Sequence, residues 1–334
     1  MRALTEYLLK HKWQALILTF LITYIPVVGM ASILIAALMT LCVGVMEGAI
    51  FTFIATLPYL LVFTGGVRES EVLTLMVWAA VILSVSGNIL TYAFAVLLRR
   101  HTSYSALVQI AALLGVLVIS VIHLVQPDVD GWWTNQITLF YNQSVEMAGL
   151  AKTGLTEGIG KEQLDKISTI SGFATGMVIA FLLFTAMIQV VLARWWQVII
   201  VNRGRMGKEL QYIRLSHLAG ALFMVSMVLS YLENRVVLDI LPILCLLFSV
   251  AGLSLTHYLC GLMERKQGRF WLMLIYLALI YSMAMMAMLP LFAALNFMLP
   301  VIIAVLILLT SIFTFMTLGF LDVWLDLRKR KKKV

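Results

Sequence analysis

Charged side chains are scarce in this sequence. Asp, Glu, Lys and Arg make up 12% of the 334 residues, whereas hydrophobic residues make up 62%. Because a water-soluble domain carries about 25% charged residues, this composition excludes an ordinary soluble fold. Uncharged runs of about 18 residues or more are typical of helices that cross a lipid bilayer. We therefore expect an all-α fold, a polytopic transmembrane helical bundle whose main partner is the bilayer.

Sequence patterns for catalysis and metal binding are also missing. The chain has no HExxH pattern and no G-x-S-x-G turn, and Leu155 stands where a phosphate-binding loop ending at Gly160 and Lys161 needs its first glycine. Its three cysteines lie in apolar runs, and its five histidines are isolated from one another. We therefore expect no enzyme, no metal ion and no cofactor. Transport would then depend on an ion gradient or on a separate ATPase.

The apolar runs define the expected spans. The first run extends from residue 13 to 66, too far for one crossing of a hydrocarbon core about 30 Å thick. Pro26, Gly29, Gly44 and Pro58 are possible break points, so three short passes are the first choice, and one span with a re-entrant pair is the alternative. Further apolar runs follow at residues 72–98, 103–126, 169–194, 214–232, 236–263, 270–293 and 298–325. The sequence thus predicts about ten spans, or eight if the first region crosses once.

Lys and Arg cluster at a few places that predict the topology, because cytoplasmic loops of membrane proteins are rich in both. In the expected transmembrane topology, one side of the membrane carries most of these basic residues. They are Lys10, Lys12, Arg99, Arg100, Arg203, Arg205, Lys208, Arg214, Arg265, Lys266, Arg269 and those of the tail. Both termini are therefore expected in the cytoplasm, and the bacterial inner membrane is the expected location. This distribution also accounts for the net charge of +8, so we expect no nucleic-acid partner.

The runs and loops divide the chain into expected regions. These are an N-terminal membrane region at 1–126, an extracytoplasmic loop at 127–167, a C-terminal membrane region at 168–327 and a basic cytoplasmic tail at 328–334. The loop mixes aromatic and polar residues, which suits the outer headgroup layer, and residues 154–172 predict a polar turn and a short helix. The tail is interpreted as a topology determinant that binds anionic lipid.

Polar side chains within the apolar runs are candidate ligands for a substrate, because they are costly in lipid. Glu47 lies between Gly44 and Gly48, and such a pair of glycines lets a neighbouring helix approach closely. We take Glu47, Asn88 and His257 as the candidate substrate-binding residues. The alternatives are a position at a helix end for Glu47 and interhelical hydrogen bonds for the other two.

Other ionisable residues are expected near the outer surface. His123 is interpreted as interfacial, at the end of its apolar run. Glu233, Arg235 and Asp239 cluster between two runs. A structural ion pair that caps the turn is the first interpretation of this cluster, and a gate is the alternative.

The string Arg194-Trp195-Trp196-Gln197, followed by Asn202, is the most distinctive local pattern. A cation and paired indoles suit the cytoplasmic headgroup layer, so these five residues are predicted to anchor the chain or to contact a cytoplasmic protein partner. The basic stretch that follows, as far as Leu215, is a candidate for a short surface helix.

That string, continued by Asn202-Arg203-Gly204 and by Glu209 to Leu215, resembles the YybS-like family of predicted bacterial inner-membrane proteins. In the proteobacterial branch of that family, Ala-Arg-Trp-Trp-Gln precedes Asn, Gly and a Glu-containing stretch that ends in Arg-Leu. The sharp likeness covers residues 192–215. The family is distantly similar to the S-components of energy-coupling-factor vitamin transporters, and this implies small-molecule capture in a helical bundle. A typical S-component has six spans, fewer than we expect here.

Two functions remain open from the sequence. One is a transporter-like or small-molecule-binding, S-component-like membrane protein with an unknown substrate. The other is a non-transporting membrane scaffold or assembly factor that recruits a cytoplasmic partner through residues 194–214 and the tail.

Overall fold

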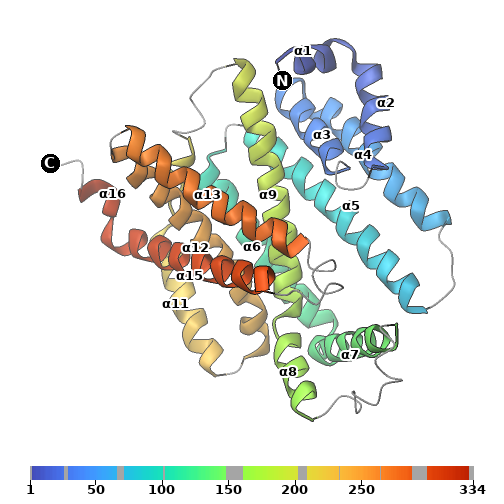
Figure 1. The fold of residues 1–334 in the computed structure, drawn as a ribbon, viewed down its shortest axis with the longest axis vertical. Helices are drawn as coiled ribbons and strands as arrows, with labels where there is room; N and C mark the ends of the chain where they lie inside the picture. The colour runs from blue at the N-terminus through green and yellow to red at the C-terminus, as the bar shows by residue number, and fades with distance from the viewer. Residues whose placement is uncertain are drawn as a thin grey trace. The chain divides into compact units, whose positions relative to one another are not determined.

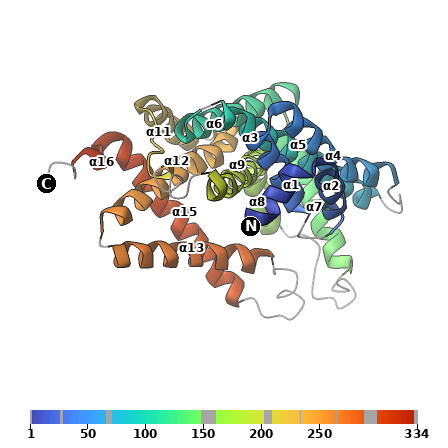
Figure 2. The ribbon, with the colours of Figure 1, turned by 90° about the horizontal axis from the view of Figure 1, so that it is seen from above.

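The computed structural model describes residues 2–25, 29–65, 71–100, 102–147, 161–201, 209–232, 234–263, 265–287 and 299–330. The regular structure within these ranges is entirely helical (Figures 1 and 2). In chain order, the helices are α1 (Arg2–Lys10), α2 (Lys12–Thr23), α3 (Met30–Cys42), α4 (Val45–Gly65), α5 (Glu71–Arg99), α6 (Tyr104–Val125), α7 (Val129–Met147), α8 (Lys161–Ser171), α9 (Ala174–Val201), α11 (His217–Tyr231), α12 (Arg235–Leu262), α13 (Arg265–Ala287), α15 (Leu299–Leu325) and α16 (Leu327–Arg330). The expected all-α fold is therefore confirmed for the described residues.

Five helices in the described part of the chain are long and apolar enough to cross a membrane, namely α5, α6, α9, α12 and α15. The shortest of these helices, α6, has 22 residues, or about 33 Å at 1.5 Å per residue, which matches a hydrocarbon core about 30 Å thick. Shorter apolar helices occupy residues 12–23, 31–42, 45–61 and 217–231. The expected class, a helical membrane protein, agrees with these lengths and compositions.

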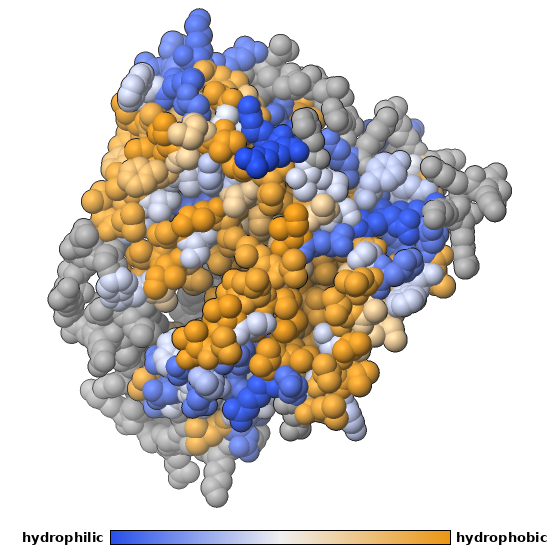
Figure 3. Space-filling view, turned by 180° about the vertical axis from the view of Figure 1, so that it is seen from behind, coloured by the Kyte–Doolittle hydropathy of each residue, from blue (hydrophilic) through white to orange (hydrophobic). Residues whose placement is uncertain are grey.

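Apolar side chains cover the outside of these helices. Leu113 on α6 has 69% of its surface exposed, and only 11% of the apolar window of α15 is buried. Figure 3 shows hydrophobic atoms over most of the described surface on the face that it draws. Soluble monomers rarely expose apolar patches of this extent, so this surface is suited to contact with the hydrocarbon chains of a lipid bilayer.

The first apolar region forms three helices, α2, α3 and α4. One break lies between Thr23 and Met30, and the other lies at Val43 and Gly44. The predicted break point Pro26 lies outside the described residues. Pro58 is not a break, because it lies inside α4. Helices α2 and α3 have 12 and 13 residues, or about 18 and 20 Å, which is shorter than the hydrocarbon core.

The chain divides into two compact units. Unit 1 comprises Met1–Met206 and Leu229–Ile243, and unit 2 comprises Gly207–Val228 and Leu244–Val334. The boundary passes through α11 and α12, so it does not follow the predicted loop at 127–167.

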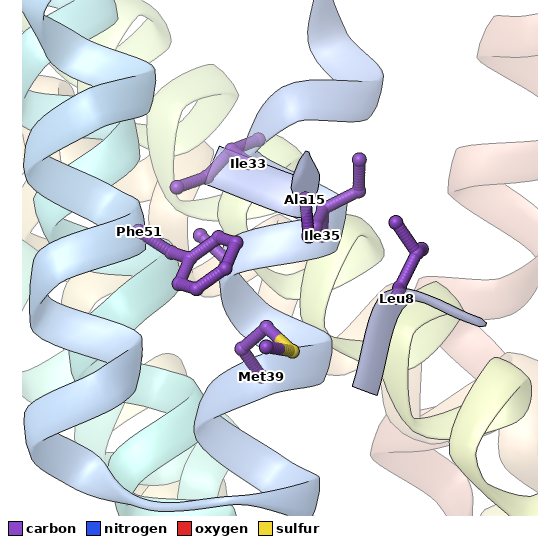
Figure 4. Packing of buried hydrophobic residues seen from close by; sticks show 7 residues of the cluster. Leu8, Ala15, Ile33, Ile35, Met39 and Phe51 are labelled. Atoms are coloured by element: carbon purple, nitrogen blue, oxygen red, sulfur yellow. The ribbon is translucent and has the colours of Figure 1, made fainter. Parts of the chain in front are cut away.

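Within unit 1, α3 is the most enclosed helix. It contacts α2, α4, α5 and α9, and Figures 1 and 2 show α9 running alongside α5. Figure 4 shows Phe51 reaching from α4 toward Ile33 and Met39 of α3. The buried cluster consists of Leu8, Ala15, Ile33, Ile35, Ala36, Met39 and Phe51.

Gly48 lies where α4 passes closest to α3. A Cβ atom at this position would lie 1.9 Å from Thr40 Oγ1, whereas a Cβ atom at Gly44 would meet nothing within 4 Å. The prediction that these glycines permit a close helix approach is therefore confirmed for Gly48 and wrong for Gly44.

The predicted outer loop contains two helices, α7 and α8, which pack against each other. Helix α8 corresponds to the predicted short helix, whereas α7 was not predicted as a helix. The indole nitrogen of Trp133 donates to Thr175 Oγ1 at 2.9 Å, and Thr134 Oγ1 donates to Ser171 Oγ at 2.8 Å. Trp133 is thus bonded to the beginning of α9, while Trp132 remains exposed.

Unit 2 is organised by a backbone contact between α12 and α15. A Cβ atom at Gly252 would lie 1.8 Å from the backbone oxygen of Phe315, and one at Gly319 would lie 2.1 Å from that of Phe248. Small residues permit such approaches between membrane helices. Phe223 of α11 packs beside them, with its ring centroid 4.6 Å from that of Phe248.

Arg328, the first residue of the predicted basic tail, has its side chain packed inside unit 2. It is 6% exposed, and its Nε donates to Asp322 Oδ2 at 2.9 Å. Its two terminal nitrogens donate to the backbone oxygens of Gln211 and Ile213. Arg328 therefore ties the segment before α11 to the end of α15.

The segment before α11 is also hydrogen-bonded to α12. Ser254 Oγ accepts the backbone N–H of Ile213 at 3.1 Å and donates to the oxygen of Leu210 at 2.6 Å. Residues 213–216 have no regular structure, so the predicted surface helix does not continue to Leu215. Residues 202–208 lie outside the described part of the chain.

Candidate functional site

Asp239 has no exposed surface and lies near the beginning of α12. Its Oδ2 is 2.8 Å from Nε2 of His123, which lies in the last turn of α6. Its Oδ1 accepts the backbone N–H of Gly176, in the first turn of α9, at 2.9 Å. Three of the five long apolar helices therefore meet at one buried carboxylate.

Gly176 makes this meeting possible. A Cβ atom at this position would lie 1.8 Å from the backbone oxygen of Asp239, so only glycine lets the backbones of α9 and α12 touch here. The N–H of Gly176 and the positive end of the α9 dipole therefore face the carboxylate. Both are favourable contacts for a carboxylate oxygen.

A second carboxyl group, Asp130 in the first turn of α7, lies beside this pair. Its Oδ2 is 3.5 Å from Nε of Arg235, and its Oδ1 is buried without a hydrogen-bond partner among the described residues. Burial raises the pKa of Asp130, Arg235 opposes this rise and the charge of Asp239 adds to it. Asp130 therefore holds a proton to higher pH than a carboxyl group in water.

Asp239, His123, Asp130 and Arg235 are together called the Asp239 centre. With both carboxyl groups ionised, two negative charges face one guanidinium, and the net charge is minus one when the imidazole is neutral and zero when it is protonated. Histidine is the side-chain type that exchanges protons near neutral pH. Ionisable groups inside membrane bundles commonly mark proton relays and ion paths.

The sequence pointed to His123 and to the cluster of Arg235 and Asp239, but not to Asp130 or to the pairs that the structure shows. Arg235 pairs with Asp130, and Asp239 pairs with a histidine 116 residues away. The side chain of His123 is 8% exposed, and the interfacial interpretation stays a prediction. Glu233 lies outside the described residues. No sequence signal links positions so far apart.

Glu47 lies in the first turn of α4 and carries an ion pair. Its Oε1 is 2.6 Å from Nζ of Lys12, and both side chains are partly exposed. The position at a helix end, which the sequence left as the alternative, therefore describes its place. The carboxylate of Glu47 therefore has favourable contacts with the positive end of α4 and with Lys12.

Asn88 is buried and links two helices. Its Nδ2 donates to Thr56 Oγ1 at 3.1 Å, which joins α5 to α4. Nearby, Thr91 Oγ1 lies 2.5 Å from Gln189 Oε1 and joins α5 to α9. These are the interhelical hydrogen bonds that the sequence allowed as the alternative to substrate contact.

The Arg194-Gln197 string is built into unit 1. Arg194 donates to Gln197 Oε1 at 2.7 Å, and Gln197 Nε2 donates to the backbone oxygen of Leu41 at 3.0 Å. The indole of Trp196 donates to Thr5 Oγ1 at 2.6 Å. Trp195 is 44% exposed, and Asn202 lies outside the described residues. The described polar groups of this string thus hold α1 and α3 in place.

The carboxyl end of α3 receives further donors from Arg99, which the sequence marked only as a topology signal. Its guanidinium donates to the backbone oxygens of Thr40, Leu41 and Val43 at 2.7 to 3.1 Å. These are carbonyl groups that a helix end leaves without partners, and a cation there also opposes the negative end of the dipole. The ends of α3, α5 and α9 therefore meet.

His257 belongs to unit 2, whereas Glu47 and Asn88 belong to unit 1, and the latter two have separate partners. His257 lines a pocket of ≈ 190 Å³ at the end of α12, and its Nδ1 is buried without a hydrogen-bond partner among the described residues. The other lining residues are Gln211, Cys260, Gly261, Met263, Gly268, Arg269 and Leu272. The described residues contain no group of three or more His, Cys, Asp or Glu side chains arranged for a metal ion.

Comparisons of the chain with protein-family models, curated proteins and solved structures give no match. The resemblance to the YybS-like family, carried by residues 192–215, therefore stays a prediction. The function is argued from the geometry of the described residues.

Proposed function

We propose that this chain is a multi-pass, transporter-like membrane protein that binds a small solute and a proton at the Asp239 centre. The observation that carries the proposal is the meeting of α6, α9 and α12 at a fully buried carboxylate paired with an imidazole. A buried charge without compensation is costly, and membrane proteins keep ionisable groups inside spans mainly where they act on ions or protons.

Charge balance suggests how solute and proton are linked. When the imidazole is neutral, the centre has a net charge of minus one, which a cationic group of a solute would restore to zero. A proton and a cationic solute would then compete for the same centre, and by linkage each weakens the binding of the other. Such competition is the basis of exchange driven by a proton gradient.

For the topology, we propose eight crossings with α2 and α3 as a re-entrant pair. Both helices are shorter than the hydrocarbon core, which supports this alternative over ten crossings. The ion pair of Lys12 with Glu47 joins the beginnings of α2 and α4, and the hydrogen bonds of Arg99 join the ends of α5 and α3. The basic clusters assign these helix ends to the cytoplasmic side. Cytoplasmic termini and a bacterial inner membrane location remain part of the proposal.

The test is a thermal-shift screen of the purified protein in neutral detergent across vitamins, amino acids, amines and inorganic cations at several pH values. A solute that binds the folded state raises the unfolding midpoint. We expect stabilisation by a cationic solute that strengthens as pH rises, is lost in Asp239→Asn and in His123→Gln, and persists in Glu47→Gln.

Proton release on addition of the same solute, measured in weak buffer with a pH indicator, gives an independent readout. Glu47→Gln is the matched control, because it also removes one carboxylate from an ion pair within unit 1. Stabilisation that is equal in wild type and Asp239→Asn, or no stabilisation by any compound, would contradict the proposal.

A further inference from the structure

We propose that a layer of apolar side chains next to the Asp239 centre is a gate that closes the path from this centre to the side of the membrane opposite α7. The inference rests on the proposed function, because it assigns the side from which the centre exchanges its proton and its solute. The layer belongs to unit 1. It consists of Ile119 of α6, Ile179 and Leu183 of α9, and Ile243 of α12, and is called the apolar layer.

The apolar layer begins one turn away from the buried carboxylate on each of the three helices that meet there. Its residues lie three or four positions from residues of that meeting point, in the pairs Ile119 and His123, Ile179 and Gly176, and Ile243 and Asp239. Residues with this spacing lie on the same face of a helix. The faces of α6, α9 and α12 that form the meeting point therefore continue into the apolar layer.

The side chains of the apolar layer exclude solvent from its interior. Ile119, Leu183 and Ile243 are each 2% exposed or less. A Cβ atom at Gly115 of α6 would lie 2.6 Å from Cδ1 of Ile243, 2.8 Å from Cδ1 of Leu183 and 3.5 Å from Cγ2 of Ile179. The tips of these three side chains thus fill the space over the glycine. Hydrophobic constrictions in membrane proteins block ions and water by dewetting.

The apolar stretch is long enough to stop a proton. After Gly176, the next polar side chains of α9 are Thr185 and Gln189, about 14 and 20 Å along the helix at 1.5 Å per residue. Gln189 pairs with Thr91 of α5, so polar contacts between helices resume there. A charge that entered the stretch between them would lose its hydration without gaining a partner, which is costly.

The side of the Asp239 centre that faces α7 is less closed. Arg235 has 66% of its side chain exposed, and its Nε lies 3.5 Å from Oδ2 of Asp130. Exposed ion pairs contribute little to stability, so this contact separates at little cost. Figure 1 shows α7 and α8 at the end of the helix bundle where α9 begins. The centre therefore exchanges its proton and solute with the side of α7, and the apolar layer bars the other side.

Exchange across the membrane then requires a second conformation in which the apolar layer opens. Alternating access closes one side of a binding site while the other side is open, and a path open on both sides would dissipate the proton gradient. The apolar layer therefore has to stay closed while the centre communicates with the side of α7. A residue that loosens the layer should cause a proton leak.

The test measures proton leak in vesicles of phosphatidylcholine and phosphatidylglycerol with a trapped pH indicator and a potassium ionophore, which removes the membrane potential. The wild type should leak little more than vesicles without protein. Ile243→Ala should accelerate the decay of an imposed pH gradient several-fold, because it empties the space beside Gly115. Leu117→Ala is the matched control and should leak as the wild type does, because it removes the same number of atoms from an exposed position on α6.

Two double variants locate the leak. Asp239→Asn should lower the leak of Ile243→Ala, because the proton then loses the buried carboxylate beside the apolar layer. Gly115→Ala should also lower it, because the added methyl group occupies space next to the atom that Ile243→Ala removes. If Ile243→Ala does not fold, Ile243→Val takes its place, since it removes only Cδ1, and a smaller leak is expected.

Equal leak rates in the Ile243 variant, Leu117→Ala and the wild type would overturn the inference. A leak that neither Asp239→Asn nor Gly115→Ala lowers would also overturn it, because the protons would then bypass the centre and the layer. The assay contains no solute, so its failure is distinct from failure of the proposed function. Stabilisation by a cationic solute without a leak in the Ile243 variant would retain the solute site and reject the gate.

Discussion

At the scale of single residues, Gly48 and Gly44 offer a matched pair of positions. A methyl group at Gly48 would overlap Thr40, whose Cα is only 2.9 Å from the added Cβ, whereas the same change at Gly44 meets open space. Gly48→Ala should therefore destabilise the protein by about 1 to 3 kcal/mol, as overpacking does, and Gly44→Ala should not. Thermal unfolding of both variants in detergent is the measurement. Equal midpoints would show that α3 and α4 do not touch at Gly48.

Asp130 gives a prediction on pH dependence. Burial raises its folded-state pKa above the unfolded value of about 3.9, so the folded protein binds more protons than the unfolded chain between these two values. The stability that this carboxyl contributes is full below the unfolded pKa and is lost as pH rises through the folded pKa. The wild type should therefore lose stability relative to Asp130→Asn as pH rises from about 4.

The measurement for Asp130 is the unfolding midpoint of both proteins across that pH range. Asp165→Asn, which removes an exposed carboxyl on α8, should show the same change of unfolding midpoint with pH as the wild type. If the unfolding midpoint of Asp130→Asn also changes with pH as that of the wild type does, burial does not raise the pKa of Asp130 in the folded protein.

Single residues show how far the sequence could predict the site. Glu47 attracted attention because it interrupts an apolar run, yet Lys12, 35 residues earlier, lies at the same end and pairs with it. Asp239 lies only four residues into α12 and gave no sign of complete burial. Its environment depends on Gly176 and His123, which lie on other helices. A single sequence does not show which residues of distant helices contact one another.

At the scale of elements, the carboxyl end of α3 depends on Arg99. Its guanidinium donates to three backbone oxygens of that end. Arg99→Gln should lower stability by about 1.5 to 3 kcal/mol, because hydrogen bonds from a charged donor are lost and carbonyl groups lose their partners. Arg100→Gln, which removes the exposed neighbouring cation, should change stability by less than about 0.5 kcal/mol.

Hydrogen exchange at residues 40–44 gives the second readout for Arg99. Exchange there should accelerate in Arg99→Gln and remain unchanged in Arg100→Gln, because Arg99 donates hydrogen bonds to this turn whereas the side chain of Arg100 is exposed. Similar exchange in both variants would mean that Arg99 acts only through its charge.

Elements whose signals are local were predicted well. Proline and glycine in the first apolar region predicted breaks, and the helices α2, α3 and α4 are separated between Thr23 and Met30 and at Gly44. Helix α7 was missed because its sequence mixes polar and aromatic residues without a long apolar face, and its packing on α8 supplies the missing stabilisation. Arg328 was assigned to the tail because it begins a run of basic residues that was interpreted as a topology determinant, whereas its side chain pairs with Asp322 inside unit 2.

At the scale of the whole molecule, composition alone predicted an all-helical membrane protein. Apolar helices of the right length follow from long uncharged runs, and their outward side chains need no partner if lipid surrounds them. The division into two units could not be predicted, because it cuts through α11 and α12 and depends on which helices pack together.

The most direct test of this account concerns the solvent around the exposed apolar surface. Spin labels would be placed at Leu113 on α6 and at Arg100, singly, after replacement of Cys42, Cys245 and Cys260 by serine, with the protein reconstituted in lipid vesicles. Electron paramagnetic resonance then compares collisions with oxygen, which concentrates in lipid, and with a water-soluble nickel complex. The account predicts that oxygen dominates at Leu113 and that the nickel complex dominates at Arg100. Dominant nickel accessibility at Leu113 would contradict the membrane placement on which every other proposal depends.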